Sequence, residues 1–293
     1  MAAALARRLA LLLAALCLGA VPAAAQTDSV ERFEEILATH GGTQILTYQT
    51  IAALGDDGVL LESVAFAPQP GAPPVTVDRV LFHSLDFEAW DAGRPPAFLS
   101  VDLVGLAPAA GPLQPGGNPL ALIGFDSESL DVRLDYRRTG PLTILDPLRI
   151  TAPGAGIIEL RGRLMNLPED PLFAQPMAFL GAQMDEASIV FTDDGMLARQ
   201  LAASAAADGR TVDQQVAAVT QGLQAVLVPP GTAAPYGSAA FAALSALLAD
   251  YQAPAPLTIT LAPAQPVPLL NLMGIGNFEA VAALFNLSVT YGG

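Results

Sequence analysis

The sequence predicts an α+β protein built around one mostly antiparallel sheet. Apolar and polar residues alternate over most of residues 44–192, and the apolar period becomes helical between residues 194 and 252. Strands that alternate in this way have one face on a core and one face in water, so we expect a one-sided, twisted sheet. Two later alternating runs, 257–261 and 286–291, are expected to return to the sheet, and the helical segment 194–252 is expected to cover it.

The sheet strands are predicted from individual runs of alternating residues. The clearest runs are 99–103, 130–136 and 158–164. Two further runs, 44–53 and 59–66, are joined into a hairpin by a turn at residues 54–59. The run from Val75 to Phe87 changes the parity of its apolar positions, which predicts a β-bulge near Arg79. Segments rich in Gly and Pro separate the strands at 68–74, 107–119, 152–156 and 168–176.

Helices are predicted before and after these strands. One covers residues 29–39, and the next covers Met196–Ala207. A third, Val212–Val228, opens with a capping box made by Thr211 and Gln214.

The remaining C-terminal elements follow a break at Pro229-Pro230-Gly231. Ser238 is the expected N-cap of a helix whose apolar stripe ends near Tyr251. Residues 266–285 are also predicted to be helical, with an interruption at residues 274–276. We predict one domain over residues 26–293; the alternative is a split near residue 193 into a β-rich part, 26–192, and a helical part with two strands, 193–293.

The first 25 residues have the pattern of a secretory signal peptide. Arg7 and Arg8 precede an apolar run over residues 9–21, and three alanines stand just before Gln26. The apolar run is shorter than the ~20 residues that span a bilayer, so cleavage after Ala25 is expected. The chain has no lysine and is rich in alanine, which together with this leader is typical of a bacterial exported protein. The predicted location is the periplasm.

Loss of this leader changes the chemistry of the chain. Cys17 is the only cysteine, and it follows Leu16 where a lipoprotein signal would have Gly or Ala, so no lipid anchor is expected. Without residues 1–25 the chain has no thiol, and its formal net charge moves from −15 to −17 because two arginines are removed. Disulfides and thiolate metal sites are therefore excluded, and binding of nucleic acid or anionic membranes is disfavoured.

The scarcity of reactive groups argues against most kinds of catalysis. The chain has no lysine for a Schiff base or a P-loop, and it has no GxSxG motif. His40 precedes Gly41-Gly42 at a helix end, where we expect it to interact with the helix dipole. His83 falls on the inward parity of its strand and is expected to be a core histidine bonded to a carboxylate or a carbonyl.

Metal and cofactor motifs are also absent from the sequence. There is no HExxH and no EF-hand loop, and Asp193-Asp194-Gly195 is expected to cap the following helix rather than to bind calcium. We predict no catalytic, metal, cofactor or named ligand-binding residue. A carboxylate-dependent hydrolase remains an alternative, because glycoside hydrolysis needs only two suitably placed carboxylates. The single tryptophan, Trp90, argues against it, since such enzymes usually bind sugars on several aromatic side chains.

Five arginines near the middle of the chain could form a basic strip or pair with neighbouring acids. They are Arg133, Arg137, Arg138, Arg161 and Arg163, and the acids on the same strands are Asp131, Asp135 and Glu159. We favour cross-strand pairing, because opposite charges on adjacent strands attract.

The leading interpretation is an exported, non-enzymatic binding or accessory protein of the bacterial envelope, holding a lipid or other apolar ligand between the sheet and the helices. The arrangement is similar in style to envelope proteins that carry lipids on a curved sheet, such as the AsmA-like and tubular lipid-binding groups. Residues that would line such a groove, but are expected to be core packing, are Val216, Leu223, Phe241, Leu244 and Leu248. The alternative is a scaffold that binds other envelope proteins.

Overall fold

The computed structural model describes most of residues 29–292. The described residues are 29–39, 42–55, 57–67, 74–92, 94, 96–107, 125, 127–168 and 181–292. The predicted signal peptide, His40 and nearly all of the loops expected at 68–74, 107–119 and 168–176 lie outside them. No helix in the described part is both long and apolar enough to cross a membrane.

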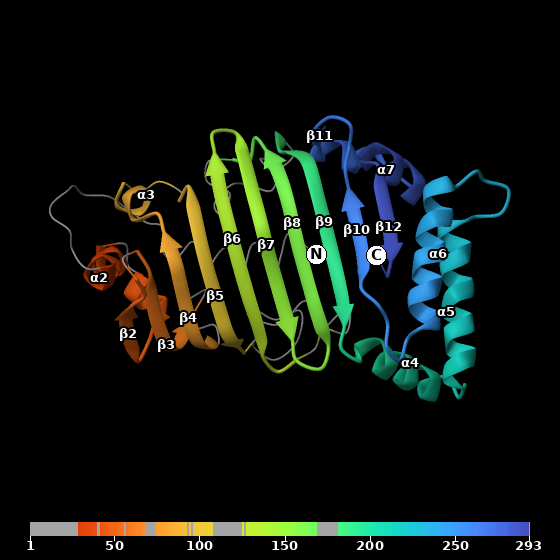
Figure 1. Cartoon of the computed structure of the whole chain (residues 1–293), viewed down its shortest axis with the longest axis horizontal. Helices are drawn as coiled ribbons and strands as arrows, with labels where there is room; N and C mark the ends of the chain where they lie inside the picture. The colour runs from red at the N-terminus through yellow and green to blue at the C-terminus, as the bar shows by residue number, and fades with distance from the viewer. Residues whose placement is uncertain are drawn as a thin grey trace.

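One antiparallel sheet dominates the described residues, as the alternating sequence predicted (Figure 1). Its twelve strands are β1 (Leu46–Thr47), β2 (Thr50–Ala53), β3 (Val59–Phe66), β4 (Val75–Leu85), β5 (Phe98–Leu106), β6 (Leu130–Thr139), β7 (Leu142–Ala152), β8 (Gly156–Met165), β9 (Gln183–Asp193), β10 (Leu257–Leu261), β11 (Val267–Pro268) and β12 (Leu287–Tyr291). From β3 to β9 each strand pairs with the next one along the chain, and β10 and then β12 extend the sheet beyond β9. The predicted return of the two C-terminal runs to the sheet is confirmed.

Six α-helices accompany the sheet in the described residues, which makes the fold α+β. They are α2 (Ser29–Thr39), α3 (Phe87–Asp91), α4 (Met196–Ala207), α5 (Val212–Leu227), α6 (Pro235–Ala249) and α7 (Phe278–Phe285), with short 3-10 turns η1 (Gly42–Gln44) and η4 (Leu269–Gly274). The predicted bounds of α2 and α4 are confirmed. The segment 266–285 is a short strand, a 3-10 turn and α7 rather than one interrupted helix.

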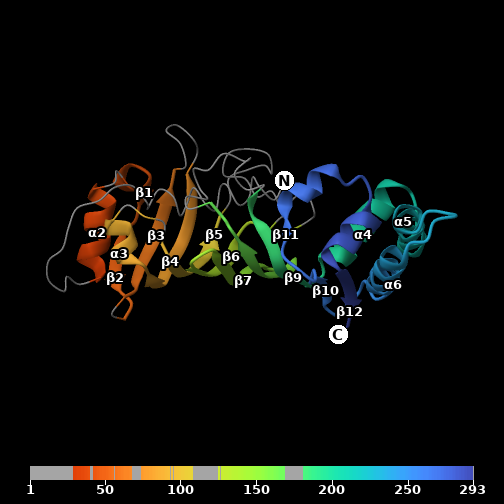
Figure 2. The same ribbon diagram turned by 90° about the horizontal axis from the view of Figure 1, so that it is seen from above.

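The helices stand at the two ends of the sheet and not over its middle (Figures 1 and 2). Helix α6 packs mainly on β12 and also on β10, while α5 packs on α4 and α6. The prediction that residues 194–252 cover the sheet is therefore met only at the C-terminal end. The reason is topological: β10 and β12 lengthen the sheet beyond β9, and α6 packs on these added strands instead of folding back over the meander.

The N-terminal end of the sheet contains the main hydrophobic core. Helix α2 places Phe33 and Leu37 on one side, and the Phe33 ring lies 5.5 Å from that of Phe82 on β4. Trp90, on α3, is buried and meets the edge of Phe87 at 6.4 Å. Periodic apolar positions on a helix and on the strands thus converge on one cluster, which is what amphipathic elements require.

Strand β4 contains a bulge, but not where the sequence predicted it. Buried Val77 and Val80 are separated by two exposed residues, which produces the change of parity near Arg79. The ladder to β3 stays in register through this point, because β3 changes parity at the same level and Ser63 there has a φ of 52°. The shift of register lies instead at His83, against β5.

The N-terminal ends of α5 and α6 show where local sequence signals predict the start of a helix correctly and where they do not. The Thr211–Gln214 capping box at the start of α5 is present, as predicted. Ser238 is not an N-cap, because α6 begins three residues earlier at Pro235. The carboxylate of Glu279, on α7, accepts hydrogen bonds from the main-chain N–H groups of Tyr236 (3.1 Å) and Gly237 (2.9 Å) instead. A cap supplied from 42 residues away along the chain has no local sequence signal.

Candidate functional site

One face of the sheet carries an unbroken row of apolar side chains. Residues that are directly paired in the register share a face, and following the pairs from β3 to β12 gives Val59, Phe82, Val101, Leu134, Leu148, Leu160, Ile189, Ile259 and Val289. A parallel row on the same face contains Leu61, Val80, Leu103, Val132, Ile150, Ile158, Phe191, Leu257 and Tyr291. The sheet therefore has a continuous apolar face across nine strands.

Coverage of the first row changes midway across the sheet. Val59 is fully buried, and Leu134, on β6, is still only 8% exposed. The residues that follow on β7 to β12 are each only partly buried; we call these five the open row, and they are Leu148, Leu160, Ile189, Ile259 and Val289. With strands about 4.8 Å apart, the open row runs about 19 Å across the sheet.

At the helical end of the molecule one residue of the parallel row, Leu257, is buried, whereas Ile158, Phe191 and Tyr291 of that row are partly buried like the open row. A second, smaller core forms where Ala243 and Leu247 of α6 pack on Leu257 of β10. Phe191 contacts both this core and the main core, so it marks the place where they meet. Ile189 and Ile259 lie one register step away from Phe191 and Leu257 and remain partly exposed. Leu148 packs against the main core and Val289 against the second core, so the two ends of the open row contact the cores and Leu160, Ile189 and Ile259 lie between them.

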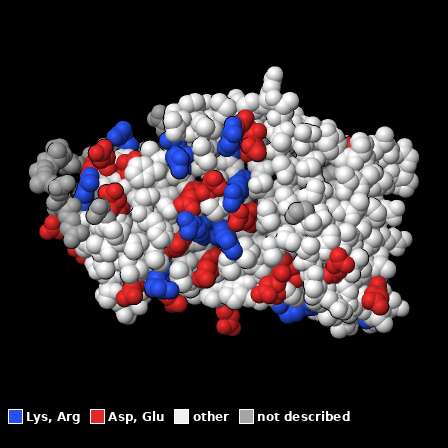
Figure 3. Space-filling model, in the orientation of Figure 1, with Lys and Arg blue, Asp and Glu red and all other residues white. Residues whose placement is uncertain are grey.

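The opposite face of the sheet is charged. Acidic and basic side chains gather over the middle strands (Figure 3). Arg161 pairs with Glu159 at 3.0 Å and with Asp146 at 3.4 Å, and Arg163 pairs with Asp185 at 2.5 Å. Cross-strand pairing is therefore confirmed for Arg161 and Arg163, but with Asp146 and Asp185 rather than with the predicted acids. Glu159 and Asp135 pair with an arginine of their own strand, and Asp131 accepts a hydrogen bond from the main chain of Gly105.

A network of side chains joins β4, β5 and β6 on this charged face. The Arg133 guanidinium donates to Asp135 at 2.9 Å, and the Ser100 hydroxyl donates to the same carboxylate at 2.5 Å. The His83 ring and Asp102 share a hydrogen bond of 2.8 Å. Burial raises the pKa of Asp135, but the hydrogen bonds from Ser100 and Arg133 and the nearby positive charges outweigh it, so the pKa lies below its ordinary value.

Asp135→Asn is expected to lower the free energy of unfolding by roughly 1 kcal/mol at pH 7. Because the folded pKa of Asp135 is depressed, its ionised form stabilises the fold above about pH 4, and this contribution is lost as the pH falls through the folded pKa. The difference between wild type and variant should therefore shrink in urea unfolding curves as the pH is lowered from 7 to well below about 4. Asp208→Asn, in the exposed pair with Arg210, is the control and should change little at either pH. An equal loss at both pH values would show that packing, not charge, is responsible.

The prediction for His83 is wrong about its position and correct about its bonding partner. Its side chain is 37% exposed and lies with the charged network, so it is not a core histidine. The cause is the bulge at His83, which shifts the parity of β4 after Phe82. The expected bond to a neighbouring carboxylate is present, with Asp102.

The other residues considered for chemistry have structural roles. Asp193 accepts hydrogen bonds from the N–H groups of Gly195 (2.8 Å) and Leu197 (2.9 Å), and Asp194 accepts one from Gly154 (3.1 Å). The predicted capping role is therefore confirmed for Asp193, which bonds to the first turn of α4, whereas Asp194 bonds to the turn between β7 and β8. In the described part of the chain, no three His, Cys, Asp or Glu side chains are grouped so that they could hold a metal ion.

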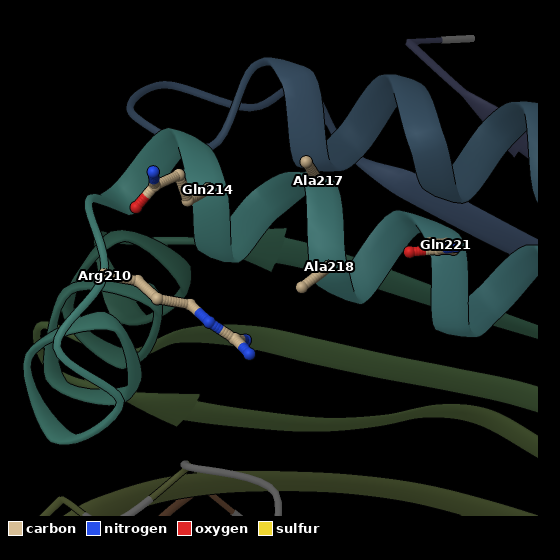
Figure 4. A pocket seen from close by; sticks show the side chains of 5 residues that line it. All are labelled: Arg210, Gln214, Ala217, Ala218 and Gln221. Atoms are coloured by element: carbon tan, nitrogen blue, oxygen red, sulfur yellow. The ribbon is translucent and has the colours of Figure 1, made fainter.

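The groove-lining candidates on the helices behave mostly as packing residues. Leu248 is buried, and Leu244 packs against the second core. Val216, Leu223 and Phe241 are partly buried. None of the five lines the shallow depression of about 440 Å³ that the structure places on α5 and the turn before it, which is lined by Arg210, Gln214, Ala217, Ala218 and Gln221 (Figure 4). The open row was missed because its members belong to separate strands, and only the register brings them together.

Comparison with known proteins gives a match to the C-terminal half of the chain. A family model described as uncharacterized protein matches residues 149–292. No curated protein matches the chain. The matched part begins within β7 and contains β8 to β12 and α4 to α7. It therefore includes the open row, except for Leu148, together with the helical end that stands beside it.

Proposed function

We propose that the chain is an exported, periplasmic, non-enzymatic binding protein of the bacterial envelope that holds a lipid or other apolar ligand on the open row. The observation that supports this proposal is the change in burial along one apolar row, from fully buried on β3 to partly exposed on β7 to β12. An apolar ligand lying on the strip would remove the remaining surface from water, which stabilises a complex by about 25 cal/mol per Å².

The shape of the open row favours an elongated ligand. Its five members are branched aliphatic side chains that follow one another across the strands for about 19 Å. It contains no polar group that would fix a compact polar ligand. An acyl chain running across the strands, with one side on the sheet and its end toward α6, satisfies this geometry.

The scaffold alternative is supported by a different observation. Phe98, Leu270 and Leu272 are large apolar side chains that are 41%, 52% and 42% exposed. Exposed residues of this kind can mark contacts with another protein. They lie on β5 and η4, so they do not form one strip as the open row does.

The first experiment is native mass spectrometry of the full chain after export to, and purification from, a bacterial periplasm, with solvent extraction of any bound molecule. The proposal expects a protein mass beginning at Gln26 and a second, lipid-sized mass at one copy per chain. A protein that retains residues 1–25 contradicts the export proposal. An empty protein that also fails to bind added fatty acid contradicts the ligand proposal.

Ile189→Asp is expected to lower the bound fraction at least tenfold, because a carboxylate on the open row would have to be desolvated by the ligand. Ser188→Asp is the matched control: it is the neighbouring residue on β9, equally partly buried, but on the charged face. Binding of a fluorescent fatty acid to both variants and to wild type measures the effect. Thermal melts of the variants establish that both are folded. Equal loss in the two variants would contradict a site on the apolar face.

A further inference from the structure

The 3-10 turn η4 presents two leucines to solvent. Leu270 is 52% exposed and Leu272 is 42% exposed. The start of the turn is anchored to the sheet: Val267, on β11, is buried, and the main-chain N–H of Leu269 donates to the carbonyl of Ala182 at 2.9 Å. The fold therefore holds two large apolar side chains in water, which is unfavourable unless a partner covers them.

The segment around η4 carries no formal charge. Residues 251–278 contain no Asp, Glu, Lys or Arg, although 14% of the chain is charged. The next charged residue, Glu279, is turned toward the start of α6, where its carboxylate accepts the N–H groups of Tyr236 and Gly237. In Figure 3 the surface above and to the right of the charged middle strands is mostly white. An apolar partner can therefore approach η4 without removing a charge of this segment from water.

The size of this patch favours a lipid surface over another protein. Six residues of 3-10 helix are about 12 Å long, and two leucines on them cannot fill the ~800 Å² per partner that a standard protein interface buries. A bilayer needs no matching shape, because small apolar groups enter its interface with a strength that follows the apolar area they bury. A chain with a formal charge of −15 is repelled by anionic headgroups, so the bilayer that fits is net neutral.

The apolar face of the sheet continues from the open row toward η4. Ile189 and Ala187 follow one another on this face of β9, and Met184 returns to it after a shift of register. Met184 pairs with Val267 on β11, and η4 begins two residues later. Along β9, Met184 is about 16 Å from Ile189. The two exposed leucines thus stand where the apolar face that carries the open row comes to an end.

We propose that η4 docks this protein on a net-neutral lipid bilayer by inserting Leu270 and Leu272 among the headgroups. The docking role depends on η4 itself, whereas its purpose, the loading and release of an apolar ligand, rests on the proposed function of the open row. Two leucines give weak, reversible docking, since even a single myristoyl chain binds a membrane only marginally. Reversible docking is what a carrier needs in order to leave the bilayer with its ligand.

Vesicle flotation of the chain purified from a periplasm tests the proposal. Vesicles of phosphatidylcholine and phosphatidylethanolamine are expected to carry the wild type upward in the gradient, and vesicles of phosphatidylglycerol should carry less of it. Replacing both leucines, Leu270→Ser with Leu272→Ser, is expected to lower the bound fraction at least fivefold, because the apolar area available for insertion is lost. Val226→Ser is the matched control: Val226 is 71% exposed but lies on α5, so flotation should be unchanged. Thermal melts establish that the variants are folded.

A fluorescent probe locates the contact independently. In a Cys17→Ser background the sequence has no cysteine, so Leu272→Cys and Val226→Cys each supply one thiol for a polarity-sensitive dye. Neutral vesicles are expected to shift the emission of the dye to the blue at Leu272→Cys and not at Val226→Cys. Equal shifts at both positions, or none at either, contradict docking through η4.

The outcomes for docking and for the open row are separable. Wild type that does not float with neutral vesicles overturns the docking proposal, even if it binds fatty acid, and would favour a protein contact for the two leucines. Flotation that the double substitution leaves unchanged, as a retained leader would give, also overturns it. The double variant is expected to bind a fluorescent fatty acid in solution as the wild type does. Flotation by a wild type that binds no fatty acid would contradict the function of the open row and leave the docking role of η4 supported.

Discussion

Phe33→Ala is expected to lower the free energy of unfolding by about 4 kcal/mol, as expected for the truncation of a fully buried aromatic ring. Phe33 is fully buried and its ring meets that of Phe82 at 5.5 Å, so the truncation removes both apolar burial and an aromatic contact. Helix α2 also has few other anchors to the sheet, because its buried side chains are those of Ser29, Phe33, Ile36 and Leu37. The cavity left by the ring would therefore loosen the whole helix.

Urea unfolding followed by tryptophan fluorescence measures this effect. Trp90 is the single tryptophan, and it belongs to the same hydrophobic cluster as Phe33. Val226→Ala is the control: that side chain is 71% exposed, so its truncation should change the free energy of unfolding by less than about 0.5 kcal/mol. A loss of under about 1 kcal/mol in Phe33→Ala would mean that α2 does not anchor the N-terminal end of the sheet.

The parts of the fold that could be predicted from the sequence are those that short-range chemistry determines. Alternation identified β5, β6 and β8 because each strand has one face on the core, and a capping box located the start of α5. The start of α6 was misplaced because its cap, Glu279, comes from α7. The side chain of His83 was assigned to the wrong face because a bulge inverts parity without leaving a clear sequence signal.

The candidate site depends on relations between strands that no single run of sequence contains. Ile189 and Ile259 are alternating apolar residues like many others, and their sequences do not say that they are adjacent or that helices leave them partly exposed. That exposure follows from the addition of β10 and β12 at one end of the sheet, which draws α6 away from the middle strands. Sequence patterns predicted an apolar face, but the extent of its coverage is a tertiary property.

The second prediction with a large expected effect on stability concerns Gly237, where α6 packs against the end of α5. A Cβ at this position would overlap the main-chain carbonyl of Leu227 at the end of α5. Backbone cannot move aside as a flexible side chain can, so Gly237→Ala is expected to lower the free energy of unfolding by about 3 kcal/mol through overpacking. The same shift would disturb the N–H groups of Tyr236 and Gly237 that Glu279 caps.

Gly222→Ala is the matched control for this substitution, because it is also a helical glycine, with no atom within 4 Å of the added methyl group. Alanine there should raise the free energy of unfolding by up to about 1 kcal/mol, since it has the higher helix propensity. Circular dichroism during urea unfolding is the suitable measurement, because Trp90 reports on the opposite end of the sheet. Opposite signs for the two variants are expected; destabilisation by both would show that these helices require glycine for a reason other than the contact with Leu227. If the fluorescence and circular dichroism transitions of Gly237→Ala also separate, the two cores unfold independently, and the open row between them lies at the boundary of two cooperative units.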